Sequence, residues 1–377
     1  QNIIGCPEIV FIVLIVRERV AHQKTYFVRP ERVLLKNPES NRTIAAKRIK
    51  ATCIVAMTGT PVENSLMDLW SIADLVFPGY LGSKKEYSER YIEKTIDKTL
   101  ENDLTDLEIL VNQILIRRMK TDVLDDLPSK IDIDQPILMS GTEKIFYDEI
   151  VSRIKSESSS RDYILQAINQ LQQYTSHPEL LNDTVTFDFK RLQATSAKFT
   201  RLFELLDIIK ARNEKVLIFA NHIKTIDILM YAVLKKYSRT VFCIDGRIVI
   251  DERVNQIDAF SAVEGFSVMI LNPTTAGMGL NITAANHVVH YSRQWNPALE
   301  EQATARAYRN KQSKEVNVYY MFYADTIEEV IDESSINQDR FEQELIYYIE
   351  KYDVTEEKTR LSQHCKYFVE TMNSKIS

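Results

Sequence analysis

The feature that most constrains the fold is a regular alternation of short apolar runs and amphipathic segments that begins at Ser196. We expect strands over residues 216–220, 241–244, 267–271, 286–291 and 316–322, with helices over 198–212 and 223–236. Strands and helices that alternate at this spacing are typical of a parallel, doubly wound α/β sheet. This part of the chain is therefore predicted to form one α/β lobe.

The residues best suited to catalysis or ligand binding lie between 271 and 312. Gly277 and Gly279 follow a predicted buried strand, and glycine lets the backbone turn sharply or approach a ligand closely. Pro297 suits the first turn of a helix, which Glu300 and Glu301 also favour, so a helix is predicted from about 297 to 309.

On that predicted helix Gln302, Arg306 and Arg309 are spaced i, i+4 and i+7, so they would share one face. Guanidinium groups are permanently charged and form bidentate hydrogen bonds to phosphate oxygens. The pattern therefore indicates a polyphosphate site. The alternative is an ordinary solvated face on which the arginines pair with nearby carboxylates.

Composition sets broad limits on the class of protein. The 377 residues are enough for two domains, and 45% hydrophobic with 27% charged residues is ordinary for a globular chain. The net charge of −6 gives no global attraction to nucleic acid, so any DNA contact must come from local basic patches.

Metal and membrane signals are weak in this sequence. The four cysteines are isolated, which indicates neither zinc nor a disulfide framework, and His177 is expected to cap or pack. The apolar run 9–16 is a predicted strand, because it is far shorter than the roughly 18 residues that span a bilayer.

The stretch 271–312 resembles motifs V and VI of the Swi/Snf-type helicase-like ATPases of helicase superfamily two. The matching residues are Gly277, Gly279, Leu280, Asn281, Trp295, Asn296, Pro297, Gln302, Ala303, Arg306, Ala307, Arg309 and Gln312. The chain departs from the pattern at Ala305, where the family usually has Asp, and at Asn310 and Lys311, where it usually has Ile-Gly. Because Ala305 offers no acceptor, another group must orient Arg306, and we expect Ala305→Asp to raise ATP turnover in a version with a P-loop.

Two more segments resemble motifs of the same family. Thr58, Gly59 and Thr60 begin a TGTP sequence that resembles motif III, which in the family links the nucleotide and DNA sides of the first lobe. The segment 114–130 resembles the family's bridging segment, and its basic residues Arg117, Arg118 and Lys120 are expected on a helix. They are interpreted as an interlobe brace or as phosphate contacts.

Parts of the ATPase machinery are absent from this sequence. No G-x-x-x-x-G-K-[ST] loop occurs, so the amide cradle and lysine that hold the β and γ phosphates are missing. Residues 30–33 occupy the Walker B position, and of that motif only Glu31 is retained. The chain is interpreted either as the C-terminal piece of a longer protein or as a degenerate relative.

The resemblance implies an α/β fold with a RecA-like parallel-sheet lobe (P-loop NTPase fold, helicase C-terminal domain), a helical insertion and a partial first RecA-like lobe. We expect residues 1–80 to form the partial first lobe, 81–195 the insertion, 196–345 the second lobe and 346–377 a charged tail.

The family resemblance implies an ATP-dependent translocase on double-stranded DNA that remodels or displaces DNA-bound proteins, with ATP and Mg²⁺ as cofactors of the complete enzyme. It assigns catalysis to Arg306, Arg309 and Glu31, and nucleotide binding to Gln302, Gly277 and Gly279.

The DNA-binding or coupling roles fall to Thr58, Gly59, Thr60, Asn281, Trp295, Arg117, Arg118 and Lys120. The short insertion favours a bacterial, nucleoid-associated cytoplasmic protein over a nuclear one. The alternative function is a catalytically inactive DNA-binding or protein-interaction module with the same fold.

Overall fold

The computed structural model describes residues 8–13, 26–28, 37–49, 54–58, 66–92, 106–119, 127–157, 161–276, 280–294, 297–310 and 312–329. These residues fall into two compact units, which divide between Leu127 and Pro128. The division lies inside the segment 81–195 that the sequence assigned to an insertion. No helix in the described ranges is both long and apolar enough to cross a bilayer.

The first unit contains a small mixed sheet. Its strand order is β2 (Tyr26–Val28), β3 (Ile54–Thr58), β1 (Glu8–Val13) and β4 (Leu115–Met119). β2 runs parallel to β3, whereas β1 is antiparallel to both β3 and β4. The expected partial lobe is therefore built on a sheet that is parallel only in part.

Helices α1 (Asn41–Lys47), α2 (Leu66–Val76) and α3 (Lys84–Tyr91) accompany this sheet, and residues 106–112 are also helical. α2 buries Ile72, Ala73 and Val76 together with Ala56 of β3. Ser83 and Glu86 form a capping box, which satisfies two backbone donors at the start of α3.

The bridging segment contains strands where the sequence predicted a mostly helical region. The expectation that Arg117 and Arg118 lie on a helix is wrong, because both belong to β4 and pair with Val10 and Ile9 of β1. A five-residue run does not distinguish strand from helix by periodicity. The deciding ladder of hydrogen bonds comes from a partner strand about a hundred residues earlier in the chain.

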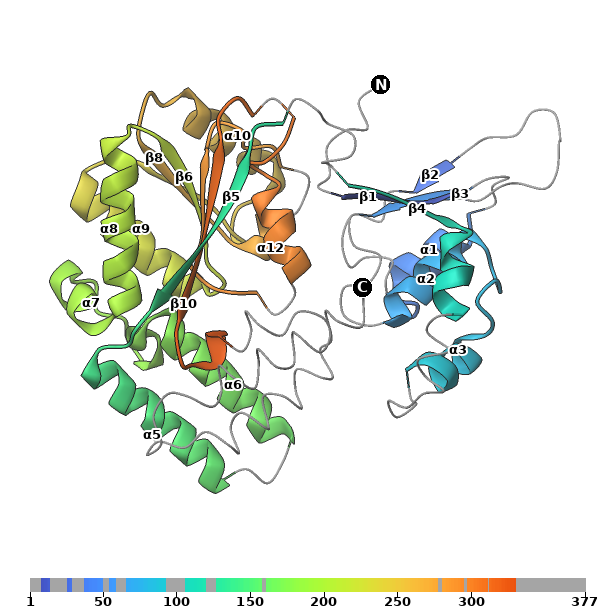
Figure 1. Ribbon diagram of the computed structural model, residues 1–377, viewed down its shortest axis with the longest axis horizontal. Coiled ribbons are helices and arrows are strands. Elements are labelled where there is room, and N and C mark those ends of the chain that lie inside the picture. Colours follow the sequence, from blue (N-terminus) through green and yellow to red (C-terminus); the bar gives the residue numbers. More distant parts are fainter. Residues whose placement is uncertain are drawn as a thin grey trace. The chain divides into compact units, whose positions relative to one another are not determined.

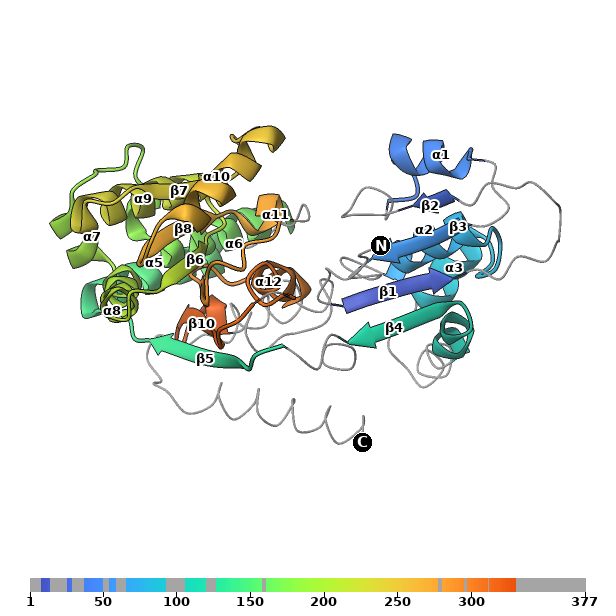
Figure 2. The same cartoon turned by 90° about the horizontal axis from the view of Figure 1, so that it is seen from above.

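The second unit is an α/β lobe with a six-stranded sheet. Its order is β5 (Lys130–Ile137), β10 (Val316–Tyr323), β9 (His287–His290), β6 (Lys215–Phe219), β8 (Ser267–Leu271) and β7 (Val241–Ile244). Every neighbouring pair is parallel. This confirms the parallel, doubly wound sheet, and β5 adds an edge strand beside β10 that the sequence did not predict (Figure 2).

Side chains of the central strands alternate between two cores, as the pleat requires. Val216 and Ile218 of β6 face a core with Phe199 and Leu202 of α8 (Ala197–Ala211), to which α9 (Ile223–Tyr237) also contributes. Leu217 and Phe219 face a second core with residues of α10 (Ile250–Ala262) and α12 (Pro297–Thr304). The helices therefore cover both faces of the sheet (Figure 1).

The chain after β5 also belongs to this unit. It contains α5 (Gly141–Glu157), α6 (Arg161–Ser176), the 3₁₀ turn η2 (Pro178–Leu181) and α7 (Phe189–Thr195). His177 caps η2, because its Nδ1 accepts from Glu179 N at 3.1 Å, while Nε2 lies 3.2 Å from Leu192 O. The predicted capping role of His177 is confirmed.

A candidate nucleotide site at the end of α12

The two arginines of the candidate site lie in a tight turn that follows α12. The predicted helix from 297 to 309 is wrong at its end, because α12 stops at Thr304. Beyond it, Arg306 N donates to Ala303 O at 3.1 Å and Ala307 N donates to Thr304 O at 3.0 Å, which is the i to i−3 pattern of a closing turn. We call residues 305–309 the arginine turn.

The helix ends there because a neighbouring segment takes its carbonyls. Arg306 O accepts from Ile282 N at 2.9 Å, and Ala307 O accepts from Gln312 Nε2 at 3.2 Å. These bonds satisfy carbonyls that a continuing helix would otherwise use. Gln302, Arg306 and Arg309 therefore do not lie on one helical face as predicted.

Both arginines nevertheless reach the same atom. Arg306 Nη1 lies 3.4 Å from Leu280 O and Arg309 Nη1 lies 3.3 Å from it. Arg306 is 5% exposed and Ala305 beside it is 3% exposed. The Leu280 carbonyl thus accepts from Arg306, whereas Ala305 offers no carboxylate.

Gln312 ties the arginine turn to the segment that follows Leu280. Its Nε2 lies 2.8 Å from Ala285 O and 3.2 Å from both Thr283 O and Ala307 O. The residue is buried, and its Oε1 accepts from Lys314 N at 3.0 Å. The sequence offered Gln312 only as a motif match, with no sign of this role.

The start of α12 is fixed by a buried ion pair. Arg293 Nε lies 3.0 Å from Glu300 Oε1, and Glu300 Oε1 also accepts from Gln294 N at 2.7 Å. The guanidinium of Arg293 stacks over the ring of Tyr320, with its Cζ 5.0 Å from the centroid. Glu300 was expected only to favour the helix dipole, and no sequence signal indicated its partner.

A neutral histidine supports the other end of α12. His290 Nε2 lies 2.8 Å from Thr304 Oγ1, and its ring stacks between Phe219 and Tyr320. Burial, followed by the positive charges of Arg293 and Lys130, lowers the pKa of His290 to about 3. The imidazole therefore stays neutral at physiological pH and adds no charge beside the arginines.

Several other predicted site residues lie on α12, beside Leu280, or on β3 and β4. Gln302 is half-buried on α12, and Asn281 is exposed next to Leu280. The backbone of Thr58 belongs to β3, and those of Arg117 and Arg118 belong to β4. Outside the described residues lie Glu31, Gly59, Thr60, Lys120, Gly277, Gly279 and Trp295.

The donor set of the arginine turn is chemically suited to phosphate, because two guanidinium groups converge near one carbonyl oxygen and guanidinium binds phosphate oxygens well. In the described part of the chain no three His, Cys, Asp or Glu side chains form a cluster that could hold a metal ion.

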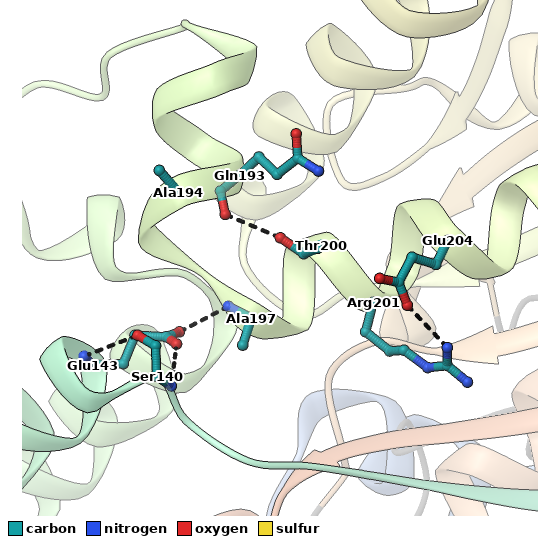
Figure 3. Close-up of a pocket in the computed structure, with 8 residues that line it drawn as sticks. All are labelled: Ser140, Glu143, Gln193, Ala194, Ala197, Thr200, Arg201 and Glu204. Carbon is teal, nitrogen blue, oxygen red and sulfur yellow. Dashed lines mark hydrogen bonds and ion pairs between the residues drawn. The ribbon is translucent and has the colours of Figure 1, made fainter.

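A separate groove of about 390 Å³ lies in the second unit, between the start of α5 and the helices α7 and α8 (Figure 3). Several of its polar side chains have partners within the protein: Glu143 accepts from the backbone N–H groups of Ser140 at 2.8 Å and Ala197 at 3.0 Å, and Arg201 pairs with Glu204 at 3.0 Å. The side chains of Glu143 and Arg201 in the groove are therefore held by contacts within the protein.

Two known protein-domain families match successive parts of this chain. Residues 17–180 match the SNF2-related domain and residues 197–311 match the helicase conserved C-terminal domain. Residues 308–377 also match the C-terminal region of YicC-like endoribonucleases, and most of that span lies outside the described residues.

Among the relatives of this chain are two bacterial proteins. It is 35% identical to the putative ATP-dependent helicase/translocase YwqA of Bacillus subtilis, covering 79% of this chain and 33% of the relative. It is 34% identical to the Zorya protein ZorD of Escherichia coli, covering 79% of this chain and 29% of the relative. The chain thus spans about a third of the length of these relatives.

A solved structure agrees in fold. The SWI2/SNF2 ATPase core domain of Sulfolobus solfataricus superposes with a TM-score of 0.50 at 26% identity, covering 88% of this chain and 71% of that one. With both domain matches in the family's order, the chain belongs to the Swi/Snf-type family of helicase-like ATPases of helicase superfamily two.

Proposed function

We propose that this chain is part of an ATP-dependent double-stranded DNA translocase that remodels or displaces DNA-bound proteins. The observation that carries the proposal is the convergence of Arg306 and Arg309 on Leu280 O, at 3.4 and 3.3 Å. It is supported by relatives such as the putative helicase/translocase of Bacillus subtilis.

In this proposal the arginine turn contacts the phosphates of ATP. Phosphoryl transfer depends on positioned positive charge around the transferred group, and arginines supply it without a proton to lose. Arg306 and Arg309 stabilise the charge that develops on the phosphate oxygens, and Gln302 donates a further hydrogen bond to the nucleotide. Bound Mg²⁺ would neutralise the phosphates, and Glu31, Gly277 and Gly279 are proposed to complete the nucleotide site.

The proposed DNA contacts lie elsewhere. Asn281 is exposed beside Leu280, and its amide can bond a phosphate oxygen without reading sequence. Arg117, Arg118 and Lys120 would supply local positive charge, which a chain of net charge −6 needs for such binding. Thr58, Gly59, Thr60 and Trp295 are proposed to couple the DNA and nucleotide sites.

We place this activity in the bacterial cytoplasm in association with the nucleoid. The support is that similar proteins occur in Bacillus subtilis and Mycoplasma genitalium.

Binding measurements test the proposal on this chain. Fluorescent MANT-ATP with Mg²⁺ should bind the wild type, and Arg306→Ala with Arg309→Ala should weaken binding by about tenfold or more. Duplex DNA should bind without sequence preference, and its affinity should fall steeply between about 50 and 200 mM salt because counterions are released. Equal MANT-ATP affinity in both proteins would refute the assignment of the arginine turn.

A second candidate function follows from the absence of a P-loop in this sequence. Because no P-loop occurs in these residues, we expect this chain alone to release phosphate from ATP negligibly, with or without DNA. Duplex binding that persists without any nucleotide binding would favour the inactive DNA-binding or protein-interaction module.

A further inference from the structure

The arginine turn is held by contacts that do not involve its own helix. Ile282 N donates to Arg306 O at 2.9 Å, and the guanidinium groups of Arg306 and Arg309 both lie near Leu280 O. These contacts all depend on where the segment 280–285 lies. The contacts that hold segment 280–285 in place therefore determine the orientation of the guanidinium groups of Arg306 and Arg309.

Gln312 makes the side-chain contacts that join the two segments. Its amide nitrogen carries two hydrogens and faces three carbonyls, those of Thr283, Ala285 and Ala307, at 3.2, 2.8 and 3.2 Å. Ala307 lies between the two arginines in sequence, while Thr283 and Ala285 follow Leu280. One buried side chain thus bonds both segments at once.

The orientation of this amide is also fixed by the backbone. Gln312 N donates to Arg309 O at 2.9 Å, and Gln312 Oε1 accepts from Lys314 N at 3.0 Å. Lys314 Nζ in turn lies 2.9 Å from Glu214 Oε1, beyond the end of α8. Because oxygen and nitrogen of the amide both have partners, the side chain has one preferred orientation.

We infer that Gln312 is a positioning residue for Arg306 and Arg309, acting through the backbone of segments 280–285 and 305–309 and touching no nucleotide. This inference rests on the proposed function, in which those arginines contact ATP. Replacing the amide should leave both guanidinium groups present but no longer aimed at one point.

Two substitutions of similar size test whether the N–H donors of the Gln312 amide, and not the volume of its side chain, hold the two segments together. Gln312→Met keeps the length but removes both donors, and Gln312→Glu places an acceptor against three carbonyls. Gln193→Glu, at an exposed position of α7, makes the same chemical change away from the arginine turn and serves as the control.

Hydrogen exchange followed by mass spectrometry gives the first readout, in the full chain. We expect peptides covering 280–286 and 303–310 to exchange about tenfold faster or more in both Gln312 variants. Peptides of α8 and α9 should exchange as in the wild type, and Gln193→Glu should change neither region.

MANT-ATP with Mg²⁺ gives the second readout. We expect its Kd to rise about tenfold in Gln312→Met and Gln312→Glu, as in Arg309→Ala. As the pH falls from about 8 to about 5.5, the carboxyl group introduced by Gln312→Glu should protonate and regain one donor, so its affinity should recover in part. Gln312→Met should show no such recovery.

Unchanged exchange in 280–286 and 303–310 for both variants would overturn the inference, and so would faster exchange spread equally over α8 and α9. If local exchange rises but MANT-ATP affinity stays at the wild-type value, Gln312 does not position nucleotide contacts and the inference is wrong. The proposed function fails by a different result, equal affinity in the wild type and in the variant lacking both arginines.

Discussion

The guanidinium of Arg293 and the carboxylate of Glu300 form a two-point ion pair within the second unit, with Nε to Oε1 at 3.0 Å and Nη2 to Oε2 at 3.1 Å. Their side chains are only 8% and 4% exposed. The pair connects the segment after β9 to the first turn of α12, and therefore sets where the helix begins.

Removal of one partner should be costly because the other charge stays buried. We expect Glu300→Ala to lower the free energy of unfolding by about 3 to 5 kcal/mol. The neighbouring Glu301 is exposed, so Glu301→Ala should change stability by about 0.5 kcal/mol or less. Urea denaturation checks both values, and similar losses in the two variants would contradict a structural role for the pair.

A second buried pair joins α8 to the chain after β10. Lys198 Nζ lies 2.5 Å from Glu328 Oε2, and burial lowers the pKa of this lysine. We expect Lys198→Met to cost about 3 to 5 kcal/mol, and addition of Glu328→Gln to restore part of that loss because no lone charge remains. Exposed Lys224→Met is the control, and additive losses in the double variant would show that the two groups do not interact.

Acid should destabilise the second unit through His177. Burial lowers the pKa of His177 to about 4, whereas the unfolded chain binds its proton near pH 6.5. Since the unfolded state then binds more protons, the free energy of unfolding should fall as the pH drops from about 6.5 to about 4, by about 3 kcal/mol from this group. His290 acts in the same direction, because its pKa is also lowered by burial.

The comparison of wild type with His177→Gln isolates this contribution. Urea denaturation at several pH values should give a shallower slope for the variant between about pH 6.5 and about pH 4. Parallel slopes in the two proteins would show that His177 does not titrate differently on unfolding.

Glu214 affects stability at lower pH. Although burial opposes the shift, its hydrogen bonds with His287 and Lys314 lower the pKa of Glu214 to about 2.

The structure changes what is expected of Ala305→Asp. The sequence suggests that a carboxylate there raises ATP turnover, but Arg306 already has Leu280 O as an acceptor and Ala305 is 3% exposed. We now expect the variant to melt at a lower temperature with no gain in MANT-ATP affinity, because it crowds a packed turn. Exposed Ala262→Asp is the control, and tighter binding with unchanged melting would restore the first expectation.

The sequence alone determined the parallel lobe, because its strands are short, apolar and regularly separated by helices. β7 and β8 have the predicted bounds, 241–244 and 267–271, and α8 and α9 lie within one residue of theirs. Local pattern suffices there because short apolar runs that alternate regularly with amphipathic helices are typical of a parallel sheet whose strands are buried on both faces.

Only the tertiary structure decided how the arginines are presented. α12 stops at Thr304 because carbonyls beyond it bond to Ile282 N and Gln312 Nε2, partners that no helical periodicity contains. β4 and β5 are likewise strands because β1 and β10 supply their ladders from about one hundred and two hundred residues away. Hydrogen bonds between distant segments are set by the packed fold, so a local sequence pattern cannot specify them.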